Sequence, residues 1–179
     1  MGDRVSVTDY LLGAETLRRR ELEWGVLRDA PAPTYRHQAL VTRVSVLLDA
    51  HARPNGLGRA LVAPVDVVLD AERHLILQPD VVFISAARWS IVGDQLWGPP
   101  DLVVEVLSPG TSRRDGGRKL EWYAQYGVKE CWLVIPWAGQ IDVHEFGTCA
   151  HVRRYGRGRR LRSAVLPELW LHVSDVFED

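Results

Sequence analysis

Two carboxylate residues occur in strand-like runs that are otherwise apolar. Glu105 lies inside Leu-Val-Val-Glu-Val-Leu (102–107), and Asp80 opens Asp-Val-Val-Phe-Ile (80–84). A buried ionised carboxylate is costly, so such a residue is expected to be neutral, paired with a cation or bound to a metal. If the two runs pair antiparallel, the start of one lies beside the end of the other, and Asp80 approaches Glu105. Two oxygen ligands with water suit a hard cation such as Mg²⁺ or Mn²⁺.

Asp101 begins the same run as Glu105. At ~3.3 Å per strand residue the two lie roughly 13 Å apart, too far to bind one ion. We therefore expect Asp101 to support the loop at the other end of the strand. For Asp80, the alternative to metal binding is a structural role in closing the turn before its strand.

The segment after Glu105 predicts a helix that carries Asp115 and Lys119. Residues four apart share a helical face, so Lys119 could lie over the two carboxylates, with Asp115 orienting or neutralising it. A cation there could lower the pKa of an attacking water and stabilise negative charge developing on a phosphate. The alternative is a solvated Asp–Lys pair on an exposed face.

The remaining pattern predicts the elements that must position these residues. Helices are expected over about 6–12, 34–52 and 114–126, a strand or hairpin arm within 20–31, and strands over 59–70, 79–85, 101–108, 129–136, 140–146 and 151–163. The last of these is expected to be a hairpin around Gly156 and Gly158. The order of elements predicts an α/β (α+β) fold with a mixed sheet and a C-terminal β-meander, in a single domain over residues 1–179.

Composition limits the class of protein. Of 179 residues, 46% are hydrophobic and 25% charged, and the formal net charge is −1. This balance argues against a purely electrostatic nucleic-acid binder but allows a local basic patch. The two cysteines have no CxxC spacing, which predicts reduced thiols in a cytoplasmic protein. No run approaches the ~18 apolar residues of a membrane helix, so we expect no membrane association.

Taken in order, these residues resemble the PD-(D/E)xK nuclease superfamily and, within it, the Uma-type family of bacterial restriction endonucleases. The resemblance spans nearly the whole chain, and its motifs are PDVVF from Pro79, DLVVEVLSP from Asp101, Arg114-Asp115 followed by Lys119 and Tyr123, and GVKECWLV from Gly127. It implies a restriction-endonuclease-like central sheet flanked by helices. It also implies hydrolysis of DNA phosphodiester bonds with Mg²⁺ or Mn²⁺.

The resemblance assigns metal binding and catalysis to Asp80 and Glu105. The superfamily's usual lysine, two residues after the strand carboxylate, is replaced here by Leu107. The resemblance implies that the catalytic lysine is relocated to the following helix, as Lys119.

Three further residues are supporting candidates. The resemblance suggests that Glu21 projects toward the site. His37, at the start of a helix, could orient substrate or carry a proton, and Asp66 could complete the acidic cluster or anchor Lys119. The alternatives are exposed charges for Glu21 and His37 and a structural role for Asp66.

Arginines near the C-terminus form a candidate nucleic-acid-binding patch, because basic side chains hold phosphates without reading sequence. They are Arg153, Arg154, Arg157, Arg159 and Arg160, and Arg18–Arg20 form a second basic cluster. The resemblance further implies a homodimer. Two other functions stay open: a non-catalytic module that binds nucleic acid or another partner, and a carboxylate-pair hydrolase such as a glycosidase.

Overall fold

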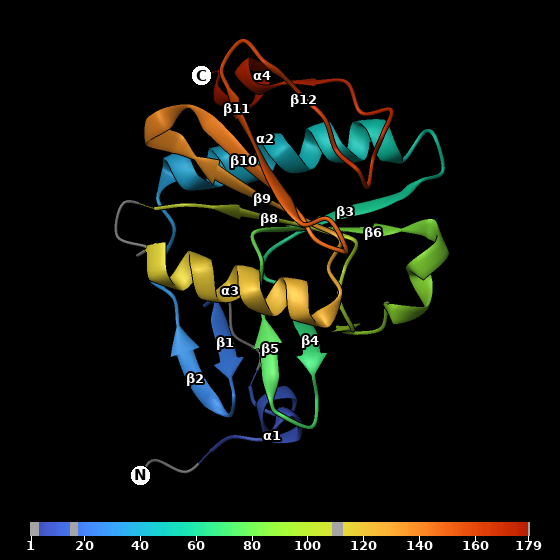
Figure 1. Cartoon of the computed structure of the whole chain (residues 1–179). Helices are drawn as coiled ribbons and strands as arrows, with labels where there is room; N and C mark the ends of the chain where they lie inside the picture. The colour runs from blue at the N-terminus through green and yellow to red at the C-terminus, as the bar shows by residue number, and fades with distance from the viewer. Residues whose placement is uncertain (1–3, 15–17, 109–112, 179) are drawn as a thin grey trace.

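A six-stranded mixed sheet is the centre of the computed structural model, which describes residues 4–14, 18–108 and 113–178, with the backbone alone for 113–116. Figure 1 shows this sheet between α2 and α3. Its strand order is β11-β10-β9-β8-β6-β3. The strands are β3 (Gly58–Val62), β6 (Val81–Ser85), β8 (Leu102–Val106), β9 (Glu130–Ile135), β10 (Gln140–Glu145) and β11 (His151–Gly156).

A second sheet lies on the α3 side of the first (Figure 1). Its order is β2-β1-β5-β4-β7. Its strands are β1 (Arg20–Glu23), β2 (Val26–Asp29), β4 (Val67–Asp70), β5 (Leu75–Leu77) and β7 (Leu96–Trp97); β12 (Arg160–Leu161) and β13 (Leu171–His172) pair separately. The first β-hairpin of the chain, β1–β2, therefore belongs to the smaller sheet. Glu105 lies within β8 of the larger sheet, and Asp80 immediately precedes β6 of the same sheet.

Four α-helices complete the fold of the described residues. They are α1 (Val7–Leu11), α2 (Tyr35–Ala52), α3 (Arg113–Tyr126) and α4 (Val173–Phe177), with short 3₁₀ segments η1 (Ala86–Ile91) and η2 (Pro136–Ala138). The Ser6 side chain caps α1, and that of Thr34 caps α2 by accepting a hydrogen bond from the His37 amide. The Thr34 cap fixes where α2 begins and so sets the position of His37 in its first turn.

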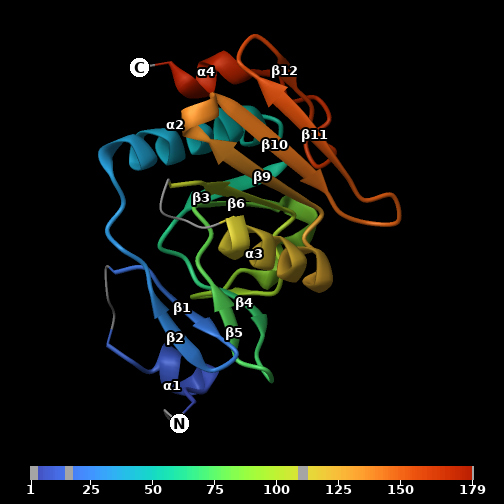
Figure 2. The same ribbon diagram turned by 60° about the vertical axis from the view of Figure 1, so that its left-hand side comes forward.

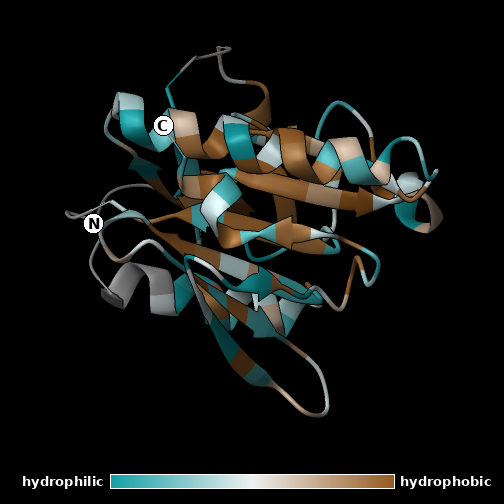
Figure 3. Ribbon diagram, turned by 90° about the horizontal axis from the view of Figure 1, so that it is seen from above, coloured by the Kyte–Doolittle hydropathy of each residue, from teal (hydrophilic) through white to brown (hydrophobic). Residues whose placement is uncertain are grey.

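Helix α2 packs on the larger sheet through residues spaced three to four apart, which is the pattern of an amphipathic helix. Its buried side chains are Val41, Val44, Leu48 and Ala52. They join a core formed by one face of the sheet and the C-terminal segment. Figure 3 shows the hydrophobic colour concentrated in the central strands and mixed with hydrophilic colour along the helices.

The opposite face of the larger sheet packs on α3 and the smaller sheet, and this second core includes Val82, Val103, Trp122 and Tyr123. Figure 2 shows α3 alongside this face, with β4 and β5 beyond it. Strand residues alternate between the two cores. Glu105, two residues from Val103, therefore lies on the α3 face, and so does Asp80, two residues from Val82.

Several predicted elements are confirmed, including the three helices and the strands that contain β6, β8, β9 and β10. The strand or hairpin arm predicted within 20–31 is a complete hairpin of β1 and β2. The single strand predicted over 59–70 is wrong: the chain leaves the larger sheet after β3 and enters the smaller one at β4. The turn at Ala63-Pro64 separates these two strands. Strand β5 was not predicted, because its three residues are too few to show a period.

The hairpin predicted over 151–163 is also wrong. Its first arm, β11, pairs with β10, whereas its second arm, β12, pairs with β13. A turn does occur at residues 157–158, between these arms. Sequence pattern alone could place the turn, but it could not show that each arm finds a better partner elsewhere.

Within the described ranges, no helix is both long enough and apolar enough to cross a membrane.

Gly58 is required where β3 enters the larger sheet. Its φ is +149°, and a Cβ there would lie 2.1 Å from the backbone oxygen of Ile84 in β6. Backbone atoms of a central strand cannot move aside cheaply. We predict that Gly58→Ala lowers the free energy of unfolding by about 2 kcal/mol or more, as measured by urea denaturation.

Gly56→Ala is the matched control for this prediction. Gly56 also has a positive φ, +65°, but its added Cβ would meet nothing within 4 Å. It should cost only about 1 kcal/mol, the conformational term alone. Equal losses for the two variants would contradict the steric argument.

Candidate functional site

The pairing of β6 and β8 brings Asp80 and Glu105 together. The strands are antiparallel, with Val81 opposite Val104, so the next residues outward on the two strands are Asp80 and Glu105. The amide of Val106 donates a 2.7 Å hydrogen bond to Oδ2 of Asp80, which ties the carboxylate to the end of β8. The two acidic side chains therefore share one face at the same end of neighbouring strands.

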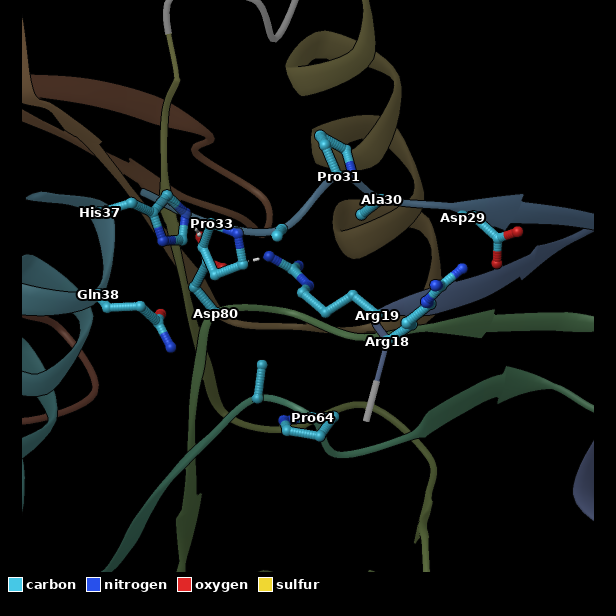
Figure 4. Close-up of a pocket in the computed structure, with 12 residues that line it drawn as sticks. Arg18, Arg19, Asp29, Ala30, Pro31, Pro33, His37, Gln38, Pro64 and Asp80 are labelled. Atoms are coloured by element: carbon cyan, nitrogen blue, oxygen red, sulfur yellow. Dashed lines mark hydrogen bonds and ion pairs between the residues drawn. The ribbon is translucent and has the colours of Figure 1, made fainter. Parts of the chain in front are cut away.

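Asp80 also contacts two basic side chains from other elements. Arg19, just before β1, forms an ion pair with Oδ1, and Nε2 of His37 in α2 lies 3.3 Å from Oδ2. Figure 4 shows Asp80 between these two side chains. Arg19 also donates to the backbone oxygen of Gln78. Asp80 thus links both sheets to helix α2.

Glu105 contacts residues of α3. The Tyr123 hydroxyl donates a 2.6 Å hydrogen bond to Oε1, and Nζ of Lys119 lies 3.6 Å from the same oxygen. Tyr123 is fully buried, whereas Lys119 keeps some contact with solvent. One turn of α3 therefore separates the hydroxyl and the amine that converge on Glu105.

Glu21 holds Lys119 in place. Its Oε1 accepts a 2.7 Å hydrogen bond from Nζ of Lys119 and a 2.9 Å bond from the backbone amide of Gln78. Arg19 and Glu21 are two residues apart, the spacing that places them on one side of an extended chain. The start of β1 thus supplies the site with both a cation and an anion.

Burial and charge separate the two strand carboxylates. Burial would raise the pKa of Asp80, but the hydrogen bond with His37 and the charge of Arg19 outweigh it and lower that pKa. Burial raises the pKa of Glu105; Lys119 and Arg19 oppose this rise, whereas the charge of Asp80 adds to it. Glu105 is therefore the carboxylate whose negative charge is least compensated by its neighbours.

Lys119 remains cationic at this position. Burial would lower its pKa, but Glu105 and Glu21 together raise it above the ordinary value. Counting charges, Asp80, Glu105 and Glu21 contribute −3, and Arg19 and Lys119 contribute +2. The cluster keeps one uncompensated negative charge when His37 is neutral, so it favours an additional cation.

Two cavities meet at Asp80. One of about 400 Å³ lies on the α3 side, and its lining includes Glu21, Glu105 and Lys119. The other, of about 460 Å³, lies toward Pro64, and its lining includes Arg18 and Gln38. Both are bordered by Arg19, His37, Asp80 and the segment 30–33. Figure 4 shows the second cavity, with Pro31 and Pro33 on one side and Pro64 on the other.

One of the remaining predicted residues, Asp66, lies away from this cluster. Asp66 accepts hydrogen bonds from Tyr10 and from the side chain of Gln78, each 2.9 Å long. The carboxylate that contacts Lys119 is Glu21 and not Asp66. The contacts of Asp66 are those of a structural residue. The side chain of Asp115 lies outside the described residues.

Asp101 lies at the opposite end of β8, as predicted from strand spacing. It is fully buried, accepts a 2.8 Å hydrogen bond from the amide of Ser85 and forms an ion pair with Nζ of Lys129, 2.6 Å away. These contacts join the end of β6 to the start of β9. Burial would raise the pKa of Asp101, but the contacts with Lys129 and Ser85 lower it.

The candidate arginine patch is divided between two faces of the sheet. Arg154 is opposite Asp142, which is opposite Leu133, which is opposite Glu105, so these four residues form one row on the α3 face. Arg154 therefore lies three strand spacings, roughly 14 Å, from Glu105. Arg153 is adjacent in sequence and so points to the other face.

The described arginines of this patch also have partners within the protein. Arg153 and Arg154 form ion pairs with Glu145 and Asp142, and Arg157 and Arg160 lie over the rings of Phe177 and Trp170. Arg159 lies in the turn before β12. Arg153 and Arg154 thus face opposite sides of the sheet, and Arg154 is the member aligned with Glu105.

Sequence reasoning missed Arg19 and Gln78 as parts of the site. Arg19 was grouped with its neighbours as a basic cluster, although its position two residues before Glu21 is a signal that the two could share a face. Gln78 precedes the Pro79-Asp80 pair, but nothing in its type predicts that its backbone would connect Arg19 and Glu21. Tyr123 was recognised only as part of a motif that carries the family resemblance.

The donor set fits a hard divalent cation. Within 4–14, 18–108 and 113–178, no group of three or more His, Cys, Asp and Glu side chains is arranged to hold a metal. Mg²⁺ often binds through one or two carboxylates together with water and substrate phosphate. Asp80 and Glu105 supply two carboxylates, and the uncompensated charge around Glu105 gives the electrostatic reason for a cation.

Comparison with known proteins places the chain in a family. Residues 8–174 match the Uma2 family, described as "Putative restriction endonuclease", so the chain belongs to it. The fold is that of a solved structure from Anabaena variabilis, titled "a putative nuclease belonging to DUF820". The TM-score is 0.82 at 18% identity, and the match covers 97% of each chain. Curated proteins give no match.

These comparisons confirm the predicted family and the restriction-endonuclease-like mixed sheet flanked by helices. They support a nuclease as the class of protein. The roles of individual residues, the metal and the DNA substrate remain predictions.

The His37–Asp80 contact predicts a pH-dependent contribution to stability. The hydrogen bond with Asp80 raises the pKa of His37 above its ordinary value, against the effect of burial. A raised folded-state pKa means that the contribution is complete below the unfolded pKa of about 6.5 and is lost as the pH rises through the folded pKa. We expect the stability advantage of the wild type over His37→Gln to shrink across that window.

Urea denaturation between pH 5.5 and 9, in the presence of EDTA, measures this difference. Because both proteins share every other titrating group, subtraction isolates His37. A difference that stays constant over the whole pH range would show that the contact does not depend on the imidazolium charge.

Proposed function

We propose that the protein is a divalent-metal-dependent endonuclease that hydrolyses DNA phosphodiester bonds. The observation that carries this proposal is the convergence of Asp80 and Glu105 with Lys119 on one face, beside a cavity of about 400 Å³. Membership of a restriction endonuclease family and a nuclease-like fold support the reaction class.

Asp80 and Glu105 would hold Mg²⁺ or Mn²⁺, which would supply charge for the phosphate and lower the pKa of a bound water. The protein fixes the two carboxylates before substrate arrives. Asp80 is held by the Val106 amide and Glu105 by the Tyr123 hydroxyl, so neither side chain has to search for its position. Such preorganisation avoids reorganisation during the reaction.

Lys119 would act on the attacking water and on the charge that develops on the phosphate. Its ammonium is held by Glu21 and lies 3.6 Å from Glu105, so it is near the proposed ligands while its own charge is maintained. Lys119 would thus take the role of the lysine that the superfamily usually has at the position of Leu107. His37 remains a predicted proton carrier or substrate-orienting residue beside Asp80.

The DNA backbone would approach across the α3 face and the segment 30–33. Arg154 lies in the same row as Glu105 and could contact a phosphate some nucleotides from the cleavage point. A single domain over residues 1–179, a cytoplasmic location and a homodimer also belong to this proposal; light scattering in solution tests the dimer.

The two lysines of the chain provide a sharp test of catalysis. Lys119 lies at the Glu105 end of β8, whereas Lys129 pairs with Asp101 at the other end. We expect Lys119→Gln and Glu105→Gln each to slow cleavage of supercoiled and single-stranded DNA in Mn²⁺ by about 10² or more. Lys129→Gln should retain cleavage, because its ion pair lies outside the cluster.

Thermal unfolding of each variant tests whether it remains folded. EDTA should abolish cleavage by the wild type. Cleavage unchanged in both site variants would exclude this site. Binding of DNA without Glu105-dependent cleavage would favour a non-catalytic module. Hydrolysis of glycosides in EDTA, without dependence on Lys119, would favour the glycosidase alternative.

A further inference from the structure

Both oxygens of the Asp80 carboxylate already contact groups of this chain. Arg19 contacts Oδ1, while the Val106 amide and His37 contact Oδ2, at 2.7 and 3.3 Å. Oδ1 has the fewer contacts, so a divalent cation that binds through Asp80 would do so at the oxygen that Arg19 now contacts, and the two positive charges would compete there. The acidic cluster favours a cation beside Asp80, and in this structure the guanidinium of Arg19 is that cation.

Arg19 lies within the negative field of the cluster. Asp80, Glu105 and Glu21 all favour its charged form and keep its pKa raised, even though burial opposes this. An arginine in a protein does not lose its proton. Arg19 can therefore relieve repulsion from an incoming dication only by moving away.

Charge balance favours such a movement. The three carboxylates contribute −3 and Lys119 contributes +1, so a dication together with Arg19 gives a net charge of +1. If Arg19 leaves, the same cluster with the dication is neutral, with His37 uncharged. Exchange of one cation for the other thus compensates the cluster more completely than adding the second to the first.

The structure provides room and chemistry for the displaced side chain. Arg19 borders both cavities that meet at Asp80, and its buried Nε has no hydrogen-bond partner within the described part of the chain. A guanidinium binds phosphate oxygens through two parallel hydrogen bonds. Both cavities border Asp80, beside which we propose that the DNA backbone is cleaved.

We propose that Arg19 exchanges partners: it pairs with Asp80 while no divalent cation is bound, and it contacts a phosphate of the DNA substrate once the cation displaces it. This inference rests on the proposed function, because it assigns the cation to Asp80 and Glu105. It makes Arg19 a competitor of the metal and a ligand of the substrate. Removing it should therefore have opposite effects on the two affinities.

The first measurement is Mn²⁺ binding, followed through the electron paramagnetic resonance signal of the free ion. Arg19→Gln should bind Mn²⁺ at least ten-fold more tightly than the wild type, because the competing cation is gone. Arg19→Lys keeps a cation and should stay close to the wild type. Adding Glu105→Ala to Arg19→Gln should remove the gain, which places the ion at the proposed site.

The second measurement is DNA binding by fluorescence anisotropy, with labelled single-stranded and duplex oligonucleotides in saturating Ca²⁺. Arg19→Gln should bind DNA at least five-fold more weakly. The control is Arg73→Gln: this exposed arginine pairs with Asp70 at 4.0 Å, borders neither cavity at Asp80 and should alter neither affinity.

The pattern of results separates the possible roles. Tighter Mn²⁺ binding with weaker DNA binding supports the exchange. Weaker binding of both would indicate a structural role for Arg19 and overturn it, and thermal unfolding in EDTA would show the accompanying loss of stability. Mn²⁺ binding that depends on Glu105 but is no tighter in Arg19→Gln overturns the exchange and leaves the proposed function intact. No Mn²⁺ binding in any variant overturns both.

Discussion

The site depends on compensating three carboxylates that the fold removes from water. Glu21, Asp80 and Glu105 are each buried, with at most 9% of their surface exposed. Isolated charges at this depth would be prohibitively costly. Arg19, Lys119 and His37 make their presence possible, together with hydrogen bonds from Tyr123 and two backbone amides. These partners come from segments far apart in the sequence, so the arrangement exists only in the folded protein.

This constraint also explains how the layers are used. The larger sheet supplies Glu105 and, at the edge of β6, Asp80. The smaller sheet supplies Glu21, α2 supplies His37, and α3 supplies Lys119 and Tyr123. The site therefore lies where both sheets and both long helices meet. A polar cluster at such a junction adds little apolar burial, and it makes the relative positions of the layers specific because every buried charge needs its partner.

Much of the catalytic hypothesis could be read from local sequence. Asp80 and Glu105 are conspicuous because they interrupt valine-rich runs, and antiparallel pairing predicts their approach without further information. The structure has that pairing, and it also places Asp101 at the far end of β8, as the rise per strand residue requires. Asp66 shows the limit of this reasoning: an acidic residue beside a buried strand looks similar in sequence, yet its partners are Tyr10 and Gln78.

The sequence by itself determined the helices, most strands of the larger sheet and the acidic pair, because these follow from residue periodicity and short-range geometry. Only the tertiary structure decided that residues 59–70 divide between two sheets, that β11 and β12 take different partners, and that Arg19 pairs with Asp80. The physical reason is that strand pairing and ion pairing depend on which segments, near or far in the sequence, together give the lowest free energy of the whole fold. Arg19 and Asp80 are separated by 61 residues, and no local pattern states that the charge of one compensates that of the other.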